Sequence, residues 1–313
     1  MKEQLVSADL LKNGLVEDVY LIHPNNSDDS SVALAVTHLS QQKKASDTPV
    51  VLIHGQFSNR SVWFDLAGDG LAKYLVELDY DVWMPEMRGH GFSPVNQRYK
   101  HNSLIDYVDY DIPAIQKYLS TRTEAPCVWV AYGLSGIALT LALAKGTLSQ
   151  NMVSGVVLLG LDDPRGAWRK NALVRALKWR ERKRGVIKSA NQPGAMEMEP
   201  YGVIHGGVNP LKPMSLFASR KQVRDFSNGL AQLQVPLMMC SGPEESDAAS
   251  ITSHKIYQRW GSADKVFMRY SNAVDEVSMV QGRHARHHVW NDLVKWLGRE
   301  ELHADVDSFE QSA

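Results

Sequence analysis

The sequence predicts an α/β domain built on a mostly parallel β-sheet. Beyond residue 48, short apolar runs alternate with amphipathic stretches, which is the pattern of βαβ units. The composition is that of an ordinary globular chain: 313 residues, 44% hydrophobic, with 34 Lys and Arg against 35 Asp and Glu. A net charge of −1 and a pI near 6.8 give no overall field that attracts nucleic acid, so no nucleic-acid partner is expected.

The predicted strands follow in order along the chain. Residues 15–22 and 32–36 flank a polar turn, and this arrangement is typical of an antiparallel hairpin. Six later apolar runs predict the strands of the parallel part. They are 50–53, 82–84, 128–131, 156–159, 237–240 and 266–270.

Two helices have clear local signals. Ser103 and Asp106 form a capping box, and the apolar stripe behind it predicts a helix over 103–119. Pro113 lies inside this helix and is expected to bend it. A second amphipathic pattern predicts a final helix around Leu293.

Residues 163–228 interrupt the alternation and predict an insertion. The predicted organisation is a core made of residues 1–162 and 229–313, with 163–228 inserted between its halves. Basic residues concentrate in the first part of the insertion. Over 165–188, ten Lys and Arg stand against Glu181 alone, which gives +9 in a chain of net −1.

This basic segment has two interpretations. Its interleaved Trp and Leu side chains suit an anionic membrane surface or an acidic partner. The plainer interpretation is a helix packed over a pocket, with its basic face in water. No run reaches the roughly 18–20 apolar residues of a membrane-spanning helix, and the first residues lack the apolar region of a signal peptide. A cytoplasmic protein is therefore expected.

Three stretches resemble a known family. An apolar strand runs into His-Gly-Gln at 54–56, and Glu-Met-Arg-Gly-His-Gly-Phe-Ser follows at 86–93. With the capped helix over 103–119, these motifs resemble the lipase/esterase branch of the α/β-hydrolase family across residues 48–298. The resemblance implies the α/β-hydrolase fold: a mainly parallel, twisted eight-stranded sheet with helices on both faces, and residues 163–228 as a helical lid.

The family carries its nucleophile in a strained strand-to-helix turn with the pattern Gly-x-Ser-x-Gly. The corresponding stretch here is Ala-Tyr-Gly-Leu-Ser at 131–135, which puts Gly133 at the nucleophile position. Ser135 serves as the nucleophile only if the turn is shifted by two residues. Otherwise Ser135 has a packing and capping role at the start of the helix.

The acid and the base of the family's triad fall on carboxylates. The acid position is Glu245, with Asp247 as the fallback, although a solvated acidic turn explains the same residues equally. The base position falls on Glu276. Two carboxylates in contact would share a proton or attract a cation. If the chain does hydrolyse esters, the alternative set is Ser135, Asp247 and His284 as a displaced base.

Histidines cluster near the predicted final helix. His284, His287 and His288 lie close to one helix face, but a structural zinc site needs four ligands and no cysteine is near. No metal and no cofactor are therefore expected. A solvated helix start is the plainer interpretation of the cluster.

The resemblance also implies an oxyanion hole. Gln56, which follows His54 and Gly55, and Leu134 are each expected to aim a backbone N–H into the pocket. A small acyl or acidic ligand can then bind without an attacking group. The predicted function is a degenerate hydrolase that retains this pocket. The alternatives are an active carboxylic-ester hydrolase and a peripheral membrane or interaction module acting through its basic lid.

Overall fold

The computed structural model describes nine stretches of the chain. They are residues 1–11, 14–41, 48–64, 69–161, 179–188, 195–205, 220–242, 247–270 and 279–299.

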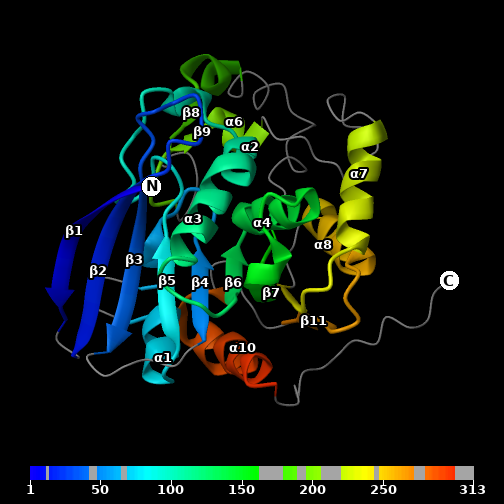
Figure 1. Ribbon diagram of the computed structural model, residues 1–313. Coiled ribbons are helices and arrows are strands. Elements are labelled where there is room, and N and C mark those ends of the chain that lie inside the picture. The colour runs from blue at the N-terminus through cyan, green and yellow to red at the C-terminus, as the bar shows by residue number, and fades with distance from the viewer. Residues whose placement is uncertain are drawn as a thin grey trace.

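One twisted sheet organises the described residues (Figure 1). Its strand order is β1-β2-β3-β5-β4-β6-β7-β10-β11. The pairs β1–β2, β2–β3 and β3–β5 are antiparallel, and the other five pairs are parallel. The strands are β1 (Lys2–Leu10), β2 (Leu15–His23), β3 (Leu34–Gln41), β4 (Pro49–Ile53), β5 (Asp81–Pro85), β6 (Cys127–Tyr132), β7 (Val153–Leu159), β10 (Leu237–Ser241) and β11 (Lys265–Arg269).

The expected strand number of eight is wrong by one, because the described sheet has nine strands. Each predicted strand overlaps an observed one, and β1 is the addition. It pairs antiparallel with β2 at the sheet edge, with a break in register between Leu5 and Ser7. Its side chains are exposed on both faces of the strand. Hydrophobic alternation marks a strand only when one of its faces is buried, so β1 had no such signal.

Helices cover both faces of the sheet. One apolar core lies between the sheet and α2, α3, α4, α7 and α8, and a second lies between the sheet and α1 and α10. The helices are α1 (Leu71–Glu77), α2 (Leu104–Asp106), α3 (Ile112–Leu119), α4 (Leu134–Lys145), α6 (Tyr201–His205), α7 (Arg220–Ala231), α8 (Asp247–Arg259), α9 (Gly282–His284) and α10 (Trp290–Leu297).

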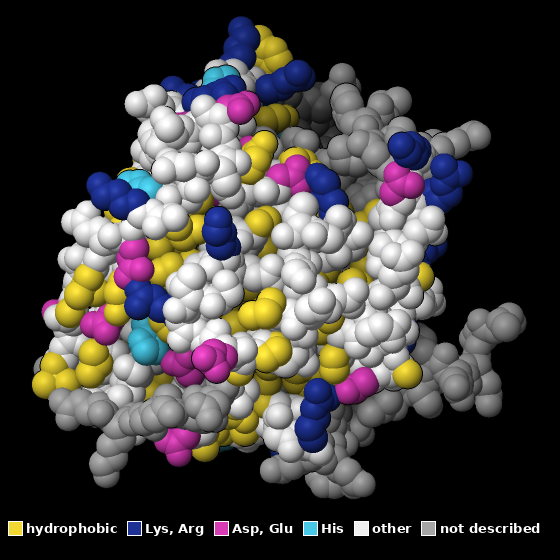
Figure 2. Space-filling model, in the orientation of Figure 1, with side chains coloured by type: hydrophobic (Ala, Val, Ile, Leu, Met, Phe, Trp, Pro, Cys, Tyr) yellow, Lys and Arg dark blue, Asp and Glu magenta, His cyan; other side chains and the backbone are white. Residues whose placement is uncertain are grey.

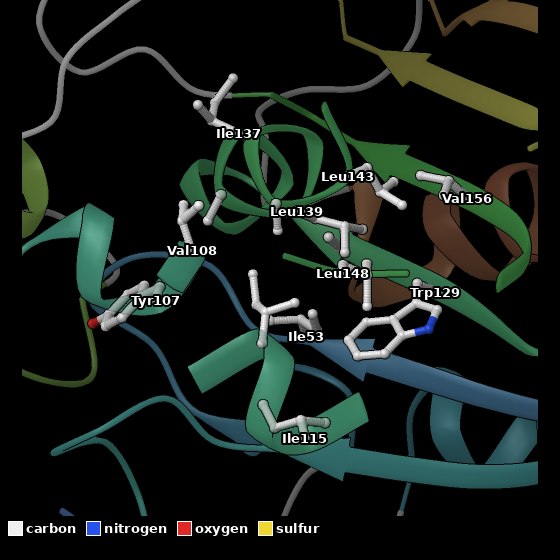
Figure 3. Packing of buried hydrophobic residues seen from close by; sticks show 14 of the residues in the cluster. Ile53, Tyr107, Val108, Ile115, Trp129, Ile137, Leu139, Leu143, Leu148 and Val156 are labelled. Atoms are coloured by element: carbon white, nitrogen blue, oxygen red, sulfur yellow. The ribbon is translucent and has the colours of Figure 1, made fainter. Parts of the chain in front are cut away.

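Alternation along the central strands divides their side chains between the two cores. In β4, Val51 and Ile53 belong to the first core, whereas Val50 and Leu52 belong to the second. Figure 3 shows Ile53 near Trp129 of β6, with side chains of α4 above it in the view and Ile115 of α3 below it. The parallel strands are thus buried on both faces, which explains their continuous apolar runs.

The predicted capping box is present at the start of α2. The backbone N–H and the hydroxyl of Ser103 both donate to the Asp106 carboxylate at 2.7 Å. The helical path continues through a π-helical turn, Tyr107–Asp111, into α3. This wider turn ends two residues before Pro113, whose missing N–H removes one helical hydrogen bond.

The predicted insertion, residues 163–228, lies partly outside the described residues. Its described parts include β8 (Val186–Ile187) and β9 (Glu199–Pro200), which pair antiparallel. Its role as a lid stays a prediction. Within the described stretches, no helix is both long enough and apolar enough to cross a bilayer.

Candidate functional site

Gly133 forms the turn between β6 and α4. Its backbone angles are φ 58° and ψ −131°, and its N–H donates to the Leu159 carbonyl at 3.0 Å. A positive φ of this kind favours glycine, because a side chain strains there. The structure therefore places Gly133 in a left-handed strand-to-helix turn, which has no side chain to present.

The side chain of Gln56 fills the space beside this turn. Its Oε1 accepts a hydrogen bond from the Leu134 N–H at 2.8 Å. A Cβ atom built on Gly133 would lie 2.6 Å from the same oxygen. The N–H predicted to hold an oxyanion is therefore bonded to the chain's own amide. A serine at position 133 would have to push that amide away.

The sequence predicts a role for the backbone N–H of Gln56, whereas the structure also gives its side chain a role, as the acceptor for the Leu134 N–H. The sequence position directly after His-Gly does not indicate which conformation a long, flexible Gln side chain adopts. The one sequence feature that could have indicated this contact is a long side chain at position 56 together with a glycine in the turn at 133.

His54 and Gly55 connect β4 to this region. The buried Nε2 of His54 accepts a hydrogen bond from the Met87 N–H at 3.1 Å, and Nδ1 lies 2.8 Å from the Gly55 carbonyl oxygen. Burial, and next the charge of His90, lower the pKa of His54 to about 3. His54 is therefore neutral at physiological pH. With both ring nitrogens engaged, it fixes two loops and has no free nitrogen for catalysis.

A buried ion pair that no sequence motif predicts lies nearby. Nε2 of His90 is 3.1 Å from the Glu199 carboxylate, and both side chains are 1% exposed. The same carboxylate accepts hydrogen bonds from the Phe57 N–H at 2.7 Å and from the Tyr107 hydroxyl at 3.2 Å. Burial is the largest single effect and lowers the pKa of His90. The charge and the hydrogen bond of Glu199, with the charge of Glu197, together outweigh burial and raise that pKa to about 9.

The segment that carries Glu199 is tied to the loop after β4. The backbone N–H groups of Met196 and Glu197 donate to the Phe57 carbonyl at 2.9 and 3.0 Å. The Glu197 carboxylate accepts from the Asn59 amide at 2.5 Å and from the Gly91 N–H at 2.9 Å. Phe57 itself has a positive φ of 55°. Part of the predicted insertion thus packs directly on the loop that carries Gln56.

Folding stability is expected to fall as the pH rises from about 6.5 to about 9. The folded-state pKa of His90 lies above its ordinary value of 6.5, so the stabilisation is complete below 6.5 and is lost as the pH rises through about 9. Replacing Glu199 by Gln removes the charge that holds the proton. Urea midpoints measured across this range should decline for the wild type and stay flat for Glu199→Gln.

The control for this experiment is Glu197→Gln, which keeps the His90–Glu199 contact and removes only a lesser contribution to the pKa of His90, so most of the decline should remain. Glu86 titrates in a different window: burial raises its pKa from 4.5 to about 7, against hydrogen bonds from the N–H groups of Phe92 and Arg60. Its stabilisation is therefore lost mainly between pH 4.5 and about 7. Equal slopes above pH 7 in the wild type and Glu199→Gln would contradict the role given to His90.

Two residues of the alternative catalytic set are described. Ser135 is the second residue of α4 and is 3% exposed, and within the described stretches no hydrogen bond joins its hydroxyl to a histidine. His284 ends α9, and its buried Nε2 has no hydrogen-bond partner among the described residues. Burial, and then the charge of His288, lower its pKa.

The predicted triad carboxylates have no described side chains. Glu245 and Glu276 lie outside the described residues, and Asp247 opens α8 with its side chain left undescribed. Their roles as acid and base positions stay predictions. Over the described ranges, no three His, Cys, Asp or Glu side chains group as ligands for a metal ion.

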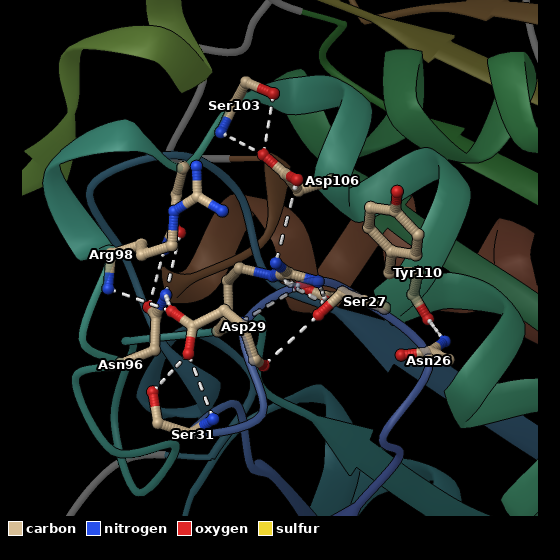
Figure 4. A network of polar contacts seen from close by, with 12 residues as sticks. Asn26, Ser27, Asp29, Ser31, Asn96, Arg98, Ser103, Asp106 and Tyr110 are labelled. Atoms are coloured by element: carbon tan, nitrogen blue, oxygen red, sulfur yellow. Dashed lines mark hydrogen bonds and ion pairs between the residues drawn. The ribbon is translucent and has the colours of Figure 1, made fainter.

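A separate polar cavity of about 150 Å³ lies between the loop after β2 and the start of α2. Figure 4 shows its network, in which Asp29 accepts hydrogen bonds from Ser31, the Asn96 amide and the Arg98 N–H. Burial opposes ionisation of Asp29, but these bonds outweigh it and hold its pKa below the ordinary range. The network joins the hairpin loop to α2, where Asp106 faces Arg88 at 3.8 Å.

Comparison with known sequences identifies a family model. Residues 48–307 match the model described as alpha/beta hydrolase fold. A 121-residue stretch is 31% identical to a protein named "Probable lipase" from Schizosaccharomyces pombe. That match covers 36% of this chain and 26% of the relative, so it spans about a quarter of the curated relative's length.

Solved structures share the fold at low sequence identity. A soluble variant of monoglyceride lipase from Saccharomyces cerevisiae aligns with a TM-score of 0.62 at 15% identity, covering 89% of this chain and 96% of that one. The Paleococcus ferrophilus monoacylglycerol lipase aligns at 0.58 and 15% identity, covering 86% and 99%. An esterase from an Arctic intertidal metagenomic library aligns at 0.55 and 14% identity, covering 96% and 100%.

Proposed function

The chain belongs to the α/β-hydrolase fold family, and from this premise we propose that it is a non-hydrolysing member of the lipase/esterase-like branch. One observation carries the proposal. Gly133 occupies the left-handed turn after β6, and the Gln56 amide takes the Leu134 N–H beside it. Without a nucleophile in that turn there is no group to form an acyl-enzyme.

The proposal includes a small ligand with an ester carbonyl or a carboxylate. The Leu134 N–H is bonded to the carbonyl oxygen of the Gln56 amide, and an acyl carbonyl or a carboxylate presents the same kind of acceptor. Such a ligand binds this N–H by displacing the amide. Gln56 is then a competitor built into the site, which lowers the affinity for the ligand.

Replacing Gln56 by Ala is therefore expected to tighten binding of a medium-chain fatty acid, decanoate, by about fivefold. The ligand no longer has to break a hydrogen bond whose net value is about 1 kcal/mol. Titration calorimetry measures the effect. Gln41→Ala is the matched control, because the Gln41 amide donates to the Val76 carbonyl elsewhere in the molecule. Absence of binding to Gln56→Ala, or an equal gain in the control, would overturn the ligand part of the proposal.

Replacing Gly133 by Ser is expected to destabilise the fold by about 1–3 kcal/mol, because the residue has a positive φ and its Cβ would press on Gln56 Oε1. In the double variant Gln56→Ala/Gly133→Ser the steric part of the cost should disappear. Urea unfolding of the wild type, the two single variants and the double variant gives the coupling free energy between the two sites. Strictly additive effects would show that the Gln56 side chain does not occupy this place.

A further inference from the structure

The described end of the basic segment is an exposed and strongly positive surface. Residues 179–184 are helical, and Trp179 at their start is 61% exposed. Glu181 is the one acid among residues 179–188, and it is buried. The exposed basic side chains of this stretch are Arg180, Arg182, Lys183, Arg184 and Lys188.

Two further segments adjoin this stretch. The Tyr201 N–H donates to the Gly185 carbonyl at 2.9 Å, and a Cβ on Gly185 would lie 2.8 Å from Cβ of Lys100. Lys100 and Arg98 are exposed and add two more positive charges. Figure 2 shows Lys and Arg side chains gathered at the top of the molecule, where Figure 1 draws the short uppermost helix.

Exposed apolar side chains occur in residues 92–101, 179–188 and 196–198, which the Ile187–Glu199 strand pairing and the hydrogen bond from the Tyr99 hydroxyl to the Met198 carbonyl hold together. They account for five of the eleven exposed large hydrophobic residues in the described stretches, namely Phe92, Val95, Trp179, Met196 and Met198. Lys183 Nζ lies 3.9 Å from the centre of the Trp179 ring, so a cation and an aromatic side chain are presented together. We call residues 92–101, 179–188 and 196–198 the basic surface.

We propose that the basic surface binds the headgroup region of an anionic lipid bilayer, with Trp179 entering the interface. Lys and Arg are attracted to anionic headgroups, and Trp is enriched at the depth where lipid and water meet. Exposed Met and Val side chains gain by entering that layer. A nucleic acid would use the cations and stack bases on the aromatic rings, but it would leave the Met and Val side chains in water, so the mixture favours lipid.

Co-sedimentation with vesicles tests the proposal. The wild type should bind vesicles of phosphatidylcholine with about 30% phosphatidylserine and should not bind pure phosphatidylcholine. Raising NaCl from about 0.05 M to about 0.5 M should release the protein, because the screening length shrinks severalfold. These measurements need no variant, so they do not depend on how a substitution folds.

Variants then locate the surface. Each Lys or Arg near the membrane is worth about a factor of five in affinity, so Lys183→Glu/Arg184→Glu should weaken binding at least about 25-fold. The matched control is Lys2→Glu/Arg259→Glu, which has the same net charge and reverses exposed residues elsewhere. Trp179→Ala should also weaken binding, whereas Leu10→Ala, at a side chain 66% exposed, should not.

Three outcomes would overturn the proposal. They are failure of the wild type to bind the anionic vesicles, binding that is insensitive to salt, and an equal loss in the two reversal variants. A separate binding experiment uses polyuridylic acid as the probe. Binding to that polymer without binding to vesicles would assign the surface to nucleic acid instead.

Discussion

Turnover of a short acyl ester such as p-nitrophenyl butyrate is expected to stay near the uncatalysed background, and Ser135→Ala is expected to leave it unchanged. Loss of triad residues costs about 10⁴–10⁶ in kcat. In relatives that lack only the nucleophile, an oxyanion hole can retain some rate, but here the Leu134 N–H is occupied by the Gln56 amide. Initial rates at saturating substrate measure the effect.

Ser154→Ala is the control for this measurement, because the Ser154 hydroxyl donates to the Pro126 carbonyl near the other end of β6. Robust turnover that disappears in Ser135→Ala and survives in Ser154→Ala would contradict the proposed function. It would favour the active-hydrolase alternative, with Ser135, Asp247 and His284 as the working set.

Replacing Asp111 by Ala is expected to destabilise the fold by about 3–5 kcal/mol, because it leaves the buried guanidinium of Arg88 without its ion-pair partner. The side chains of Arg88 and Asp111 are 3% and 0% exposed, and Arg88 donates from Nε and Nη2 to Asp111 Oδ1 at 2.9 and 2.6 Å. Asp106 also pairs with Arg88, but at 3.8 Å it lies beyond hydrogen-bond distance and therefore replaces the lost partner only in part. Arg88 anchors the loop that carries Glu86 and His90.

The control is Asp109→Ala in the same π-helical turn. Asp109 pairs with Lys145 at the surface, where an ion pair contributes about 0–1 kcal/mol. Urea unfolding of both variants gives the two free energies. Equal losses of unfolding free energy would show that the buried pair contributes no more than the surface pair. That result would contradict the anchoring role given to Arg88.

Most of the fold was predictable because its central strands are buried on both faces. Continuous apolar runs such as 50–53 distinguish such strands from the amphipathic helices between them. The capping box at Ser103 was equally local, since both of its partners lie within four residues. The edge strand β1 was not predicted, because exposure of both its faces removes the hydrophobic alternation by which a strand is recognised.

The site was predictable only where the chain order of motifs could place a residue. Gly133 follows a recognisable strand and precedes a recognisable helix, so its position followed from the sequence. The His90–Glu199 pair joins residues 109 positions apart, and no periodicity relates two such residues. The conformation of the Gln56 side chain depends on the space that Gly133 leaves open, and the sequence alone does not define that space. Glu245 and Glu276 stay predictions.

Whether any nucleophile serves the turn after β6 is decided by intact-mass spectrometry after exposure to a fluorophosphonate, which traps activated serines covalently. The proposed function predicts an unchanged mass for the wild type, because Gly133 has no side chain and Ser135 lies inside α4. A single adduct per chain that peptide mapping assigns to Ser135 would contradict it.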